Sequence, residues 1–364
     1  MQRAKILLVF ISLVGFAGSP ALAQEPPAQP AAPSATDTVT LKSNRVITGR
    51  VAADTYEKVD VEVTGADGQK SVVSSPAAEV REVRYGDQPS AYAQAMFDQK
   101  QGKHEAVVAG LDKLLKDPKS PRWMPQYALL NMATSYVAWA ERDKAQYAQA
   151  QAAFERLVKE VPNSRFTVEA RLGLSQCCMA LGQHDKAAAA LADLVAGKFG
   201  EGPALQGELL AGKSLEAQEK VADAEKKYAA VAARGEKGFP ELATAGLLNR
   251  AGCLTKMQKY ADAQGILVKL AKEAQTEDLK ALAYNNLGEC LLAQKELREA
   301  QLAFLRVVVL YFKVKDEHGR ALYWSGQCFE KRGDPSRANE LYDELRSKYP
   351  NSAWAKKVPV PEKK

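Results

Sequence analysis

One stretch of the chain carries the residue types of a phosphate-binding loop. Residues 207–214 read GELLAGKS, which fits the pattern G-x-x-x-x-G-K-[ST]. Such a loop follows a strand and directs backbone N–H groups, the lysine and the hydroxyl at phosphates and magnesium. No strand pattern precedes residue 207, and the eight residues fall inside a predicted helix. We therefore interpret Lys213 as a helix residue and Gly212 as a small packing residue, and we predict no nucleotide or other cofactor.

The five cysteines could form disulfides or bind a metal. Four of them, Cys177, Cys253, Cys290 and Cys328, hold the same position in a repeated segment described below, and Cys178 follows the first. Equivalent positions on neighbouring helices are about 8–10 Å apart, beyond the ~7 Å Cα separation that a disulfide tolerates. No C-x-x-C is present. We predict that the cysteines are buried thiols that fill space between helices.

The remaining candidates for chemistry do not form a site. His104, His184 and His318 lie far apart in the sequence, and there is no His-Glu-x-x-His or Gly-x-Ser-x-Gly motif and no paired-carboxylate constellation. The formal charge is +6, from 50 basic and 44 acidic residues that are interspersed along the chain. A nucleic-acid binder would show a clustered basic face. We predict no catalytic residue, no metal site, no nucleic-acid partner and no enzyme activity, with an enzyme of unrecognised type as a remote alternative.

The start of the chain has the order of a secretory signal peptide. Arg3 and Lys5 precede an apolar run over residues 6–16, and Ala21-Leu22-Ala23 supplies a small-x-small cleavage site. The run is shorter than the ~20 residues of a membrane span, and no later segment could form one. No cysteine follows the site to carry a lipid. We predict a signal peptide over residues 1–23, cleavage after Ala23, and a periplasmic location in a Gram-negative-type bacterium. A Pro/Ala-rich linker follows over residues 24–36.

Residues 37–87 show the alternation of β-strands. β-branched and polar residues alternate around Val39, Leu41 and over residues 59–63, with turn signals at residues 43–45 and 65–68. We predict strands at residues 38–43, 46–52, 57–64, 70–74 and 79–85. Five short strands suit a small SH3-like or Sm-like barrel, which buries too little surface to be stable alone and could dock on the helices that follow. Its function could be partner binding through a strand edge or structural capping.

Residues 89–355 are helical and repetitive. Equivalent alanines recur at steps of 44, 37, 37, 39, 37 and 38 residues, and they are Ala106, Ala150, Ala187, Ala224, Ala263, Ala300 and Ala338. Four residues after most of them stands a large side chain: Phe154, Leu191, Tyr228, Leu267, Phe304 and Tyr342. A turn lies five residues before, as at Gly182 and Gly333, and a small residue lies twelve before. The pattern predicts about seven helix–turn–helix units in which small residues allow close helix packing and the large residue fills the gap to the next unit. A basic tail, residues 356–364, follows, and we expect it to be disordered.

This pattern resembles the tetratricopeptide repeat, whose consensus places Leu-Gly, an aromatic, Ala, Phe, Ala and Pro in order. Asn286-Leu287-Gly288 followed by Ala300 and Phe304 is the closest match. The usual unit has 34 residues, so these units are longer. The phrases Val161-Pro162-Asn163-Ser164 and Tyr349-Pro350-Asn351-Ser352 are similar to those of bacterial envelope members, the YbgF-type Tol-Pal coordinators and the BamD-type outer-membrane assembly lipoproteins. The chain lacks the coiled coil of the first group and the lipid-bearing cysteine of the second.

The resemblance implies a concave groove lined by the first helix of each repeat. Carried over by position, the groove residues are Leu172, Gln176, Met179, Lys213, Glu216, Asn285, Glu289, Leu292, Arg320, Tyr323, Gln327 and Glu330. The lysine and asparagine clamp of chaperone-binding members is not matched. Because the lining is mixed apolar and polar, we predict a scaffold that binds peptide segments of envelope proteins in the groove. The alternative is a cell-wall or polysaccharide binder that acts through the β module.

Overall fold

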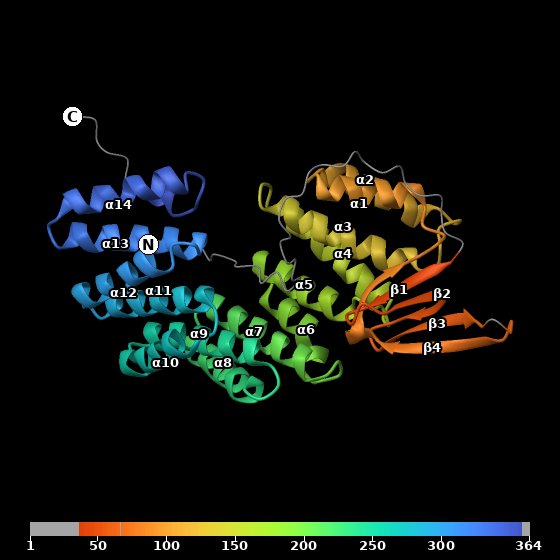
Figure 1. The fold of residues 1–364 in the computed structure, drawn as a ribbon, viewed down its shortest axis with the longest axis horizontal. Coiled ribbons are helices and arrows are strands. Elements are labelled where there is room, and N and C mark those ends of the chain that lie inside the picture. Colours follow the sequence, from red (N-terminus) through yellow and green to blue (C-terminus); the bar gives the residue numbers. More distant parts are fainter. Residues whose placement is uncertain (1–35, 66, 359–364) are drawn as a thin grey trace. The chain divides into compact units, whose positions relative to one another are not determined.

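A computed structural model describes residues 36–65 and 67–358 (Figure 1). The predicted signal peptide, residues 24–35 of the predicted linker and residues 359–364 of the predicted tail lie outside the described residues. The chain divides into two compact units, Met1–Leu194 and Val195–Lys364. The first unit contains a β-sheet and helical hairpins, and the second contains helical hairpins throughout.

The sheet has the five strands that the alternation predicts. They are β1 (Asp37–Leu41), β2 (Val46–Asp54), β3 (Lys58–Thr64), β4 (Lys70–Pro76) and β5 (Val80–Arg84). All pairings are antiparallel in the order β4-β3-β2-β1-β5, so the last strand returns to pair with the first. Alternate side chains enclose one apolar core, namely Val39, Leu41, Ile47, Val59, Val61 and Val80. The predicted small all-β module of SH3-like or Sm-like type is confirmed.

Strand β2 changes partner along its length. Its first half pairs with β1, from Thr40 opposite Val46 to Asp37 opposite Gly49. Its second half, residues 50–54, pairs with β3. At the crossover a Cβ on Gly49 would lie 2.2 Å from the backbone oxygen of Glu62, so only glycine fits between the two strands. The second half of β2 therefore extends past the end of β1.

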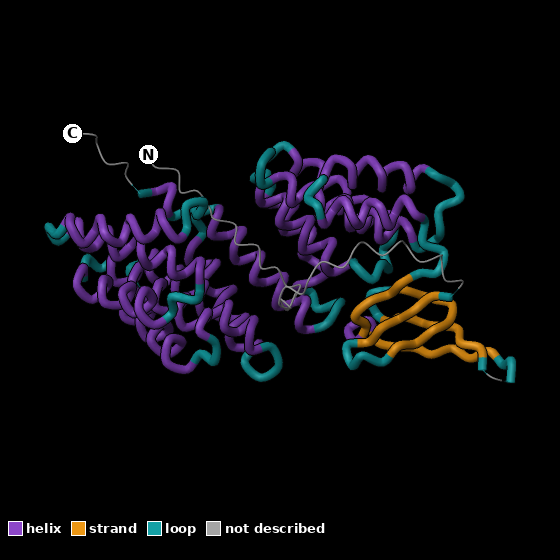
Figure 2. The backbone as a smooth tube through the Cα atoms, turned by 45° about the horizontal axis from the view of Figure 1, so that its top comes forward, coloured by secondary structure: helices purple, strands orange, loops and turns teal. Residues whose placement is uncertain are grey.

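Helices follow in antiparallel pairs (Figure 2). The first unit contains α1 (Ser90–Lys100), α2 (His104–Lys116), α3 (Met124–Ala140), α4 (Gln146–Glu160), α5 (Thr167–Ala180) and α6 (His184–Val195). The second contains α7 (Glu201–Ala217), α8 (Val221–Gly235), α9 (Pro240–Lys256), α10 (Tyr260–Glu273), α11 (Glu277–Ala293), α12 (Leu297–Leu310), α13 (Lys315–Lys331) and α14 (Pro335–Lys348). The described part of the chain thus has the seven predicted hairpins. None of its helices is long and apolar enough to cross a bilayer.

The turn inside a hairpin uses a left-handed residue in every case except that between α3 and α4. Gly182 and Gly333 have φ values of 72° and 81°, which glycine adopts without strain. The equivalent residues of the three intervening repeats are Glu219, Gln258 and Lys295, with φ values of 63°, 60° and 69°. The conformation is therefore imposed by the hairpin, because these side chains do not favour it.

Small residues bring the two helices of a hairpin together, as predicted. A Cβ on Gly212, Gly288 or Gly326 would lie 2.3 to 2.5 Å from the ring of Tyr228, Phe304 or Tyr342 respectively. Each of these rings therefore lies on the glycine of its own hairpin. The predicted filling of the gap to the next hairpin is seen at Phe154 of α4, because a Cβ on Gly173 of α5 would lie 2.4 Å from its ring. Phe304 does both, because its ring also stacks on Trp324 of α13 with centroids 6.2 Å apart.

Two predictions about individual residues hold in the structure. All five cysteines are buried free thiols. Residues 207–214, the apparent phosphate loop, lie within α7 and form ordinary helix.

The start of the predicted tail corrects the sequence analysis. Val358 is buried, at 6 % exposure, and packs with Leu322, Tyr342 and Leu345 of the last hairpin. A short 3₁₀ turn, η2 (Ala355–Lys357), leads to it. Residues 356–358 therefore form part of a cap on the last hairpin, because an unpaired helical hairpin leaves an apolar face to cover.

Candidate partner-binding groove and the cleft beside the sheet

The first helices of three successive hairpins in the second unit line a hollow of about 360 Å³. Its polar lining consists of Glu216 from α7, Asn249, Thr255 and Lys256 from α9, and Asn286 and Glu289 from α11. Asn249, Gly252 and Lys256 are spaced by three and four residues, so they share one helix face. First helices therefore do line a common concavity in this unit.

The hollow contains two of the predicted groove residues, Glu216 and Glu289. Lys213 and Leu292 are half-buried on the same helices but outside the hollow. Burial lowers the pKa of Lys213, and Glu216 opposes that effect. The lining residues of α9 were absent from the prediction, although the spacing of Asn249, Gly252 and Lys256 could have identified them.

Asn285 is a correction. Its side chain is fully buried and donates hydrogen bonds to the backbone oxygen of Glu317, at 2.9 Å, and to its carboxylate, at 2.6 Å. It therefore joins α11 to the start of α13 and is inaccessible to a ligand. The neighbouring Asn286 lines the hollow in its place, whereas the predicted Glu289 of the same helix does line it.

The predicted residues of α13 make contacts within the protein. Arg320 donates to the carboxylate of Glu289 at 3.0 Å, to that of Glu317 at 3.2 Å and to the side-chain oxygen of Asn286 at 2.8 Å. Gln327 donates to the hydroxyl of Tyr342 at 2.8 Å and to Glu330 at 3.0 Å. Arg320 thus links α13 to the hollow.

The structure also corrects the prediction for Tyr323, because other side chains of the protein cover part of its ring. Its ring lies 5.5 Å from that of Trp354 and 5.2 Å from that of Trp324. The ammonium group of Lys357 lies 3.8 Å from the centroid of Trp354. The C-terminal cap therefore covers part of a side chain that was predicted to line the groove.

The three predicted residues of α5, Leu172, Gln176 and Met179, are half-buried and belong to the first unit. The structure places none of them in the hollow of the second unit. Whether they contact a partner stays a prediction.

A tyrosine–glutamate pair recurs at a spacing of twelve residues. The hydroxyl of Tyr228 donates to Glu216 at 2.7 Å, and that of Tyr342 donates to Glu330 at 3.0 Å. Burial, followed by the nearby carboxylate, raises the pKa of Tyr228, so its hydroxyl stays a donor. The equivalent pair in another hairpin is apolar, Phe304 with Leu292. Both partners therefore change character together. Glu216 also pairs with Lys256, at 2.5 Å, which fixes its carboxylate in the hollow.

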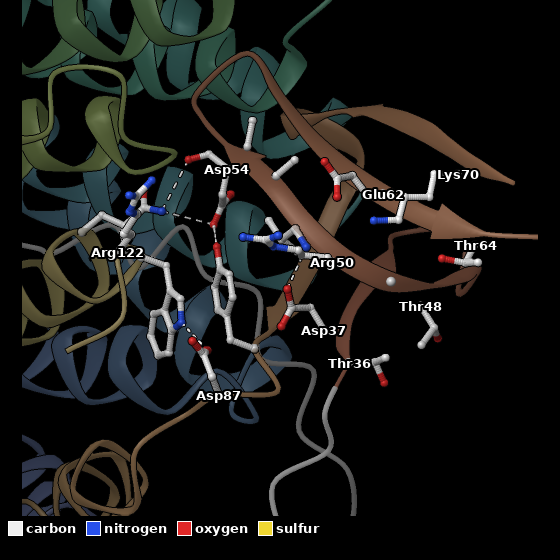
Figure 3. Close-up of a pocket in the computed structure, with 17 residues that line it drawn as sticks. Thr36, Asp37, Thr48, Arg50, Asp54, Glu62, Thr64, Lys70, Asp87 and Arg122 are labelled. Carbon is white, nitrogen blue, oxygen red and sulfur yellow. Dashed lines mark hydrogen bonds between the residues drawn. The ribbon is translucent and has the colours of Figure 1, made fainter. Parts of the chain in front are cut away.

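A second concavity, in the first unit, lies between the sheet and the start of α3 (Figure 3). It has a volume of about 1040 Å³ and is lined by residues 48–54 of β2, by Asp37, Glu62, Lys70 and Asp87, and by Tyr85, Arg122, Trp123 and Gln126. Arg50 and Lys70 come from the sheet, and Arg122 comes from the helical side. We call it the sheet–helix cleft.

Asp54 joins the sheet to the helices at the base of this cleft. Its carboxylate, 3 % exposed, accepts hydrogen bonds from Tyr85 at 2.9 Å, from Tyr127 at 2.7 Å and from Gln126 at 3.3 Å. Arg165 lies 4.0 Å away and donates to the backbone oxygen of Val80 at 3.0 Å. The module is therefore docked on the first hairpins, as its small size led us to expect.

Comparisons with known proteins bear on the helical part of the chain. Models of the tetratricopeptide repeat match residues 141–211 and 320–352. The two matched segments are tetratricopeptide repeats. No protein with a curated description matches the chain in sequence.

Among solved structures, a tetratricopeptide repeat protein from Parabacteroides merdae is similar at a TM-score of 0.54 with 13 % identity, over 73 % of this chain and 95 % of that one. PilF of Pseudomonas aeruginosa is similar at a TM-score of 0.43 with 14 % identity, over 64 % of this chain and 95 % of that one. The first likeness supports the tetratricopeptide fold. The second is too weak to support an argument.

Tetratricopeptide repeats bind other proteins, and scaffolding without catalysis is typical of the fold. In the described residues, no three His, Cys, Asp or Glu side chains gather as a metal site. The hollow has amide and charged side chains on walls formed mainly by three first helices.

Proposed function

We propose that this chain is an exported, periplasmic scaffold that binds a peptide segment of another envelope protein in the hollow over α7, α9 and α11. The sequence of residues 1–23 supports export. The tetratricopeptide segments support a protein partner. The hollow is the proposed place of peptide binding, because three successive hairpins line it.

The state of the Asn249 side chain is the single observation that supports peptide binding in this hollow. Its half-buried carboxamide lines the hollow and, within the described residues, makes no hydrogen bond to the protein. A carboxamide has both a donor and an acceptor, which match the carbonyl and the N–H of a peptide backbone. The other polar side chains of the hollow are already paired, as in Glu216 with Lys256 and Asn286 with Arg320. Asn249 is therefore the group best placed to hold a peptide.

The test compares partner binding by the mature chain, residues 24–364, with binding by Asn249→Ala. Partners are captured from the organism's own envelope extract, and the affinity of the one recovered is measured by calorimetry. We expect Asn249→Ala to weaken binding by about 1 kcal/mol, the usual net contribution of a hydrogen bond.

Asn339→Ala is the matched control, because Asn339 is exposed on α14 and outside the hollow. Equal affinities for the wild type and Asn249→Ala would place the binding surface elsewhere. Export is checked separately by the intact mass of periplasmic protein, which we expect to begin at Gln24.

A further inference from the structure

The second half of β2 presents a strand edge to the sheet–helix cleft. β1 begins at Asp37, opposite Gly49, so residues 50–54 of β2 lie beyond the pairing with β1 and, among the described strands, pair with β3 alone. All five of these residues line the cleft. Two of their backbone groups are engaged: Val51 N–H donates to the carboxylate of Asp37 at 2.7 Å, and the Asp54 carbonyl accepts from Gln126 at 3.4 Å. Between these two points the pairing with β3 is irregular at Ala52, and residues 52 and 53 line the cleft.

The acidic and the basic side chains that line the cleft differ in how many bonds they form within the protein. Asp37 accepts hydrogen bonds from the N–H groups of Val51 and Gly86, and Asp87 accepts from the indole N–H of Trp123 at 2.7 Å. Asp54 is buried and accepts from Tyr85, Tyr127 and Gln126.

The cations contrast with these acids. Arg50, Lys70 and Arg122 are exposed and form no ion pair or hydrogen bond through their side chains in the part of the chain that the structure describes. Glu62 is the one lining carboxylate in that part without such a bond. Neutral donors leave the acids of the cleft charged, so four carboxylates and three cations line it. The three cations have no partner within the described residues, and they are therefore the groups available to pair with carboxylates of a ligand.

The aromatic wall of the cleft is rigid and largely covered. Trp123 stacks on Tyr85, with ring centroids 4.4 Å apart, and meets Tyr92 and Tyr127 at right angles, at 5.5 Å each. A sugar ring binds by stacking on an open aromatic face, and neighbouring rings occupy that of Trp123. The wall is therefore better suited to shape the cleft than to hold a glycan.

We propose that the sheet–helix cleft binds an extended acidic peptide segment, which lies along residues 50–54 of β2 as an added strand and places its carboxylates near Arg50, Lys70 and Arg122. Main-chain pairing at a strand edge supplies affinity, and the flanking charges select the sequence. This site is separate from the hollow of the second unit and is independent of it.

The experiment titrates the mature chain with a capped hexapeptide of alternating glutamate and valine, and with its lysine–valine counterpart, by calorimetry at low salt. Wild type should bind the acidic peptide and not the basic one. Arg50→Glu with Arg122→Glu should lose the acidic peptide by about tenfold or more for each charge, and should gain the basic one. Arg45→Glu is the matched control, because Arg45 is exposed on the turn before β2 and outside the cleft.

Hydrogen exchange provides the second readout, since strand addition should protect amides of residues 50–54 in the complex. Absence of acidic-peptide binding, equal loss in Arg45→Glu, or binding without protection of β2 would each overturn the proposal. Binding of an oligogalacturonate in place of the peptide would assign the cleft to an anionic glycan and overturn it as well. Thermal melting of each variant shows whether the sheet still folds.

Discussion

Two turns of this molecule share the sequence Pro-Asn-Ser, but the chain forms different structures after them. Residues 161–164 read VPNS and follow α4, and residues 349–352 read YPNS and follow α14. In each, the serine hydroxyl oxygen accepts a backbone N–H just ahead: Ser164 from Phe166 at 3.1 Å, and Ser352 from Ala355 at 3.0 Å. In each, an aromatic side chain two residues after the serine packs on a tyrosine: Phe166 on Tyr127, and Trp354 on Tyr323.

After the first turn the chain continues as a full helix, α5. That turn also holds the sheet, because Ser164 donates to Gln126 at 2.9 Å and Tyr56 N–H donates to the Asn163 carbonyl at 3.4 Å. After the second turn the chain makes only the short 3₁₀ turn and buries Val358. Pro359 follows in the sequence, and a residue before proline disfavours the helical conformation. The same Pro-Asn-Ser motif therefore precedes a new repeat in one place and a cap on the last repeat in the other. The residues that follow the motif determine which of the two structures forms.

The largest effect should come from removing the buried carboxylate that fixes the sheet beside the first turn. Asp54→Ala leaves Tyr85, Tyr127 and Gln126 without this acceptor and Arg165 without its nearby carboxylate, so we expect a loss of about 3 kcal/mol in the stability of the first unit. Hydrogen exchange by mass spectrometry would locate the loss in the sheet and α3. Asp54→Asn keeps one acceptor oxygen and should lose less. Equal behaviour of the two variants would contradict the role given to the carboxylate.

The cap at the second turn should contribute less. Trp354 is half-buried on Tyr323 and Trp324, so Trp354→Ala should destabilise the second unit by about 2 kcal/mol, below the cost of a fully buried aromatic. Phe304→Ala, which truncates a ring with no exposure, provides the upper reference at about 3–5 kcal/mol. Chemical denaturation of both variants tests the order. A Trp354→Ala protein as stable as wild type would mean that residues 352–358 do not cap the hairpin.

A substitution in a turn inside a repeat should increase the stability of the protein, in contrast to the two substitutions above. Gln258 is exposed and left-handed, so Gln258→Gly should stabilise the second unit by about 0.5–1 kcal/mol. Gln258→Ala keeps the Cβ and should bring no such gain. Denaturation midpoints decide between them, and equal midpoints for the two variants would contradict the strain assigned to this turn.

The smallest effect should be a pH dependence of the stability of the second unit, which arises at the second turn. His318 is buried with Nδ1 2.9 Å from the hydroxyl of Tyr349, and Nε2 lies 4.0 Å from Glu344. Burial lowers the pKa of His318 below its ordinary value of 6.5, Glu344 raises it, and Lys348 lowers it further. Since the unfolded chain then binds the proton more readily, the second unit should lose stability as pH falls below about 6.5. His318→Gln should flatten that slope, and an unchanged slope would assign it to another group.

The repeats were predictable because their packing depends on residue size at fixed spacing. The small packing residue Gly288 and the buried Cys290 follow from the register alone. The strands of the β module were predictable for the same reason, since Val39, Val59 and Val61 alternate with polar residues.

Contacts between distant segments could not be read from that pattern. Asn285 and Asn286 are equivalent in type, and only the position of Glu317 determines which is buried. The partial cover of Tyr323 depends on how residues 352–358 fold back. The left-handed Glu219, Gln258 and Lys295 show no glycine at positions where the hairpin still requires that conformation. Docking of the sheet depends on the fit of Asp54 to Gln126 and Tyr127 of α3, to Arg165 in the turn before α5, and to Tyr85, which no local spacing encodes.

Site-specific photo-crosslinking in living cells tests most directly the claim that a partner lies in the hollow over α7, α9 and α11. A photoreactive phenylalanine analogue is placed at Asn249, at Asn339 on α14 as the matched control, and at Arg50 in the sheet–helix cleft. We expect a discrete protein adduct from position 249 and none from position 339. Adducts of equal yield from 249 and 339, or from position 50 alone, would contradict a partner-binding groove in the second unit.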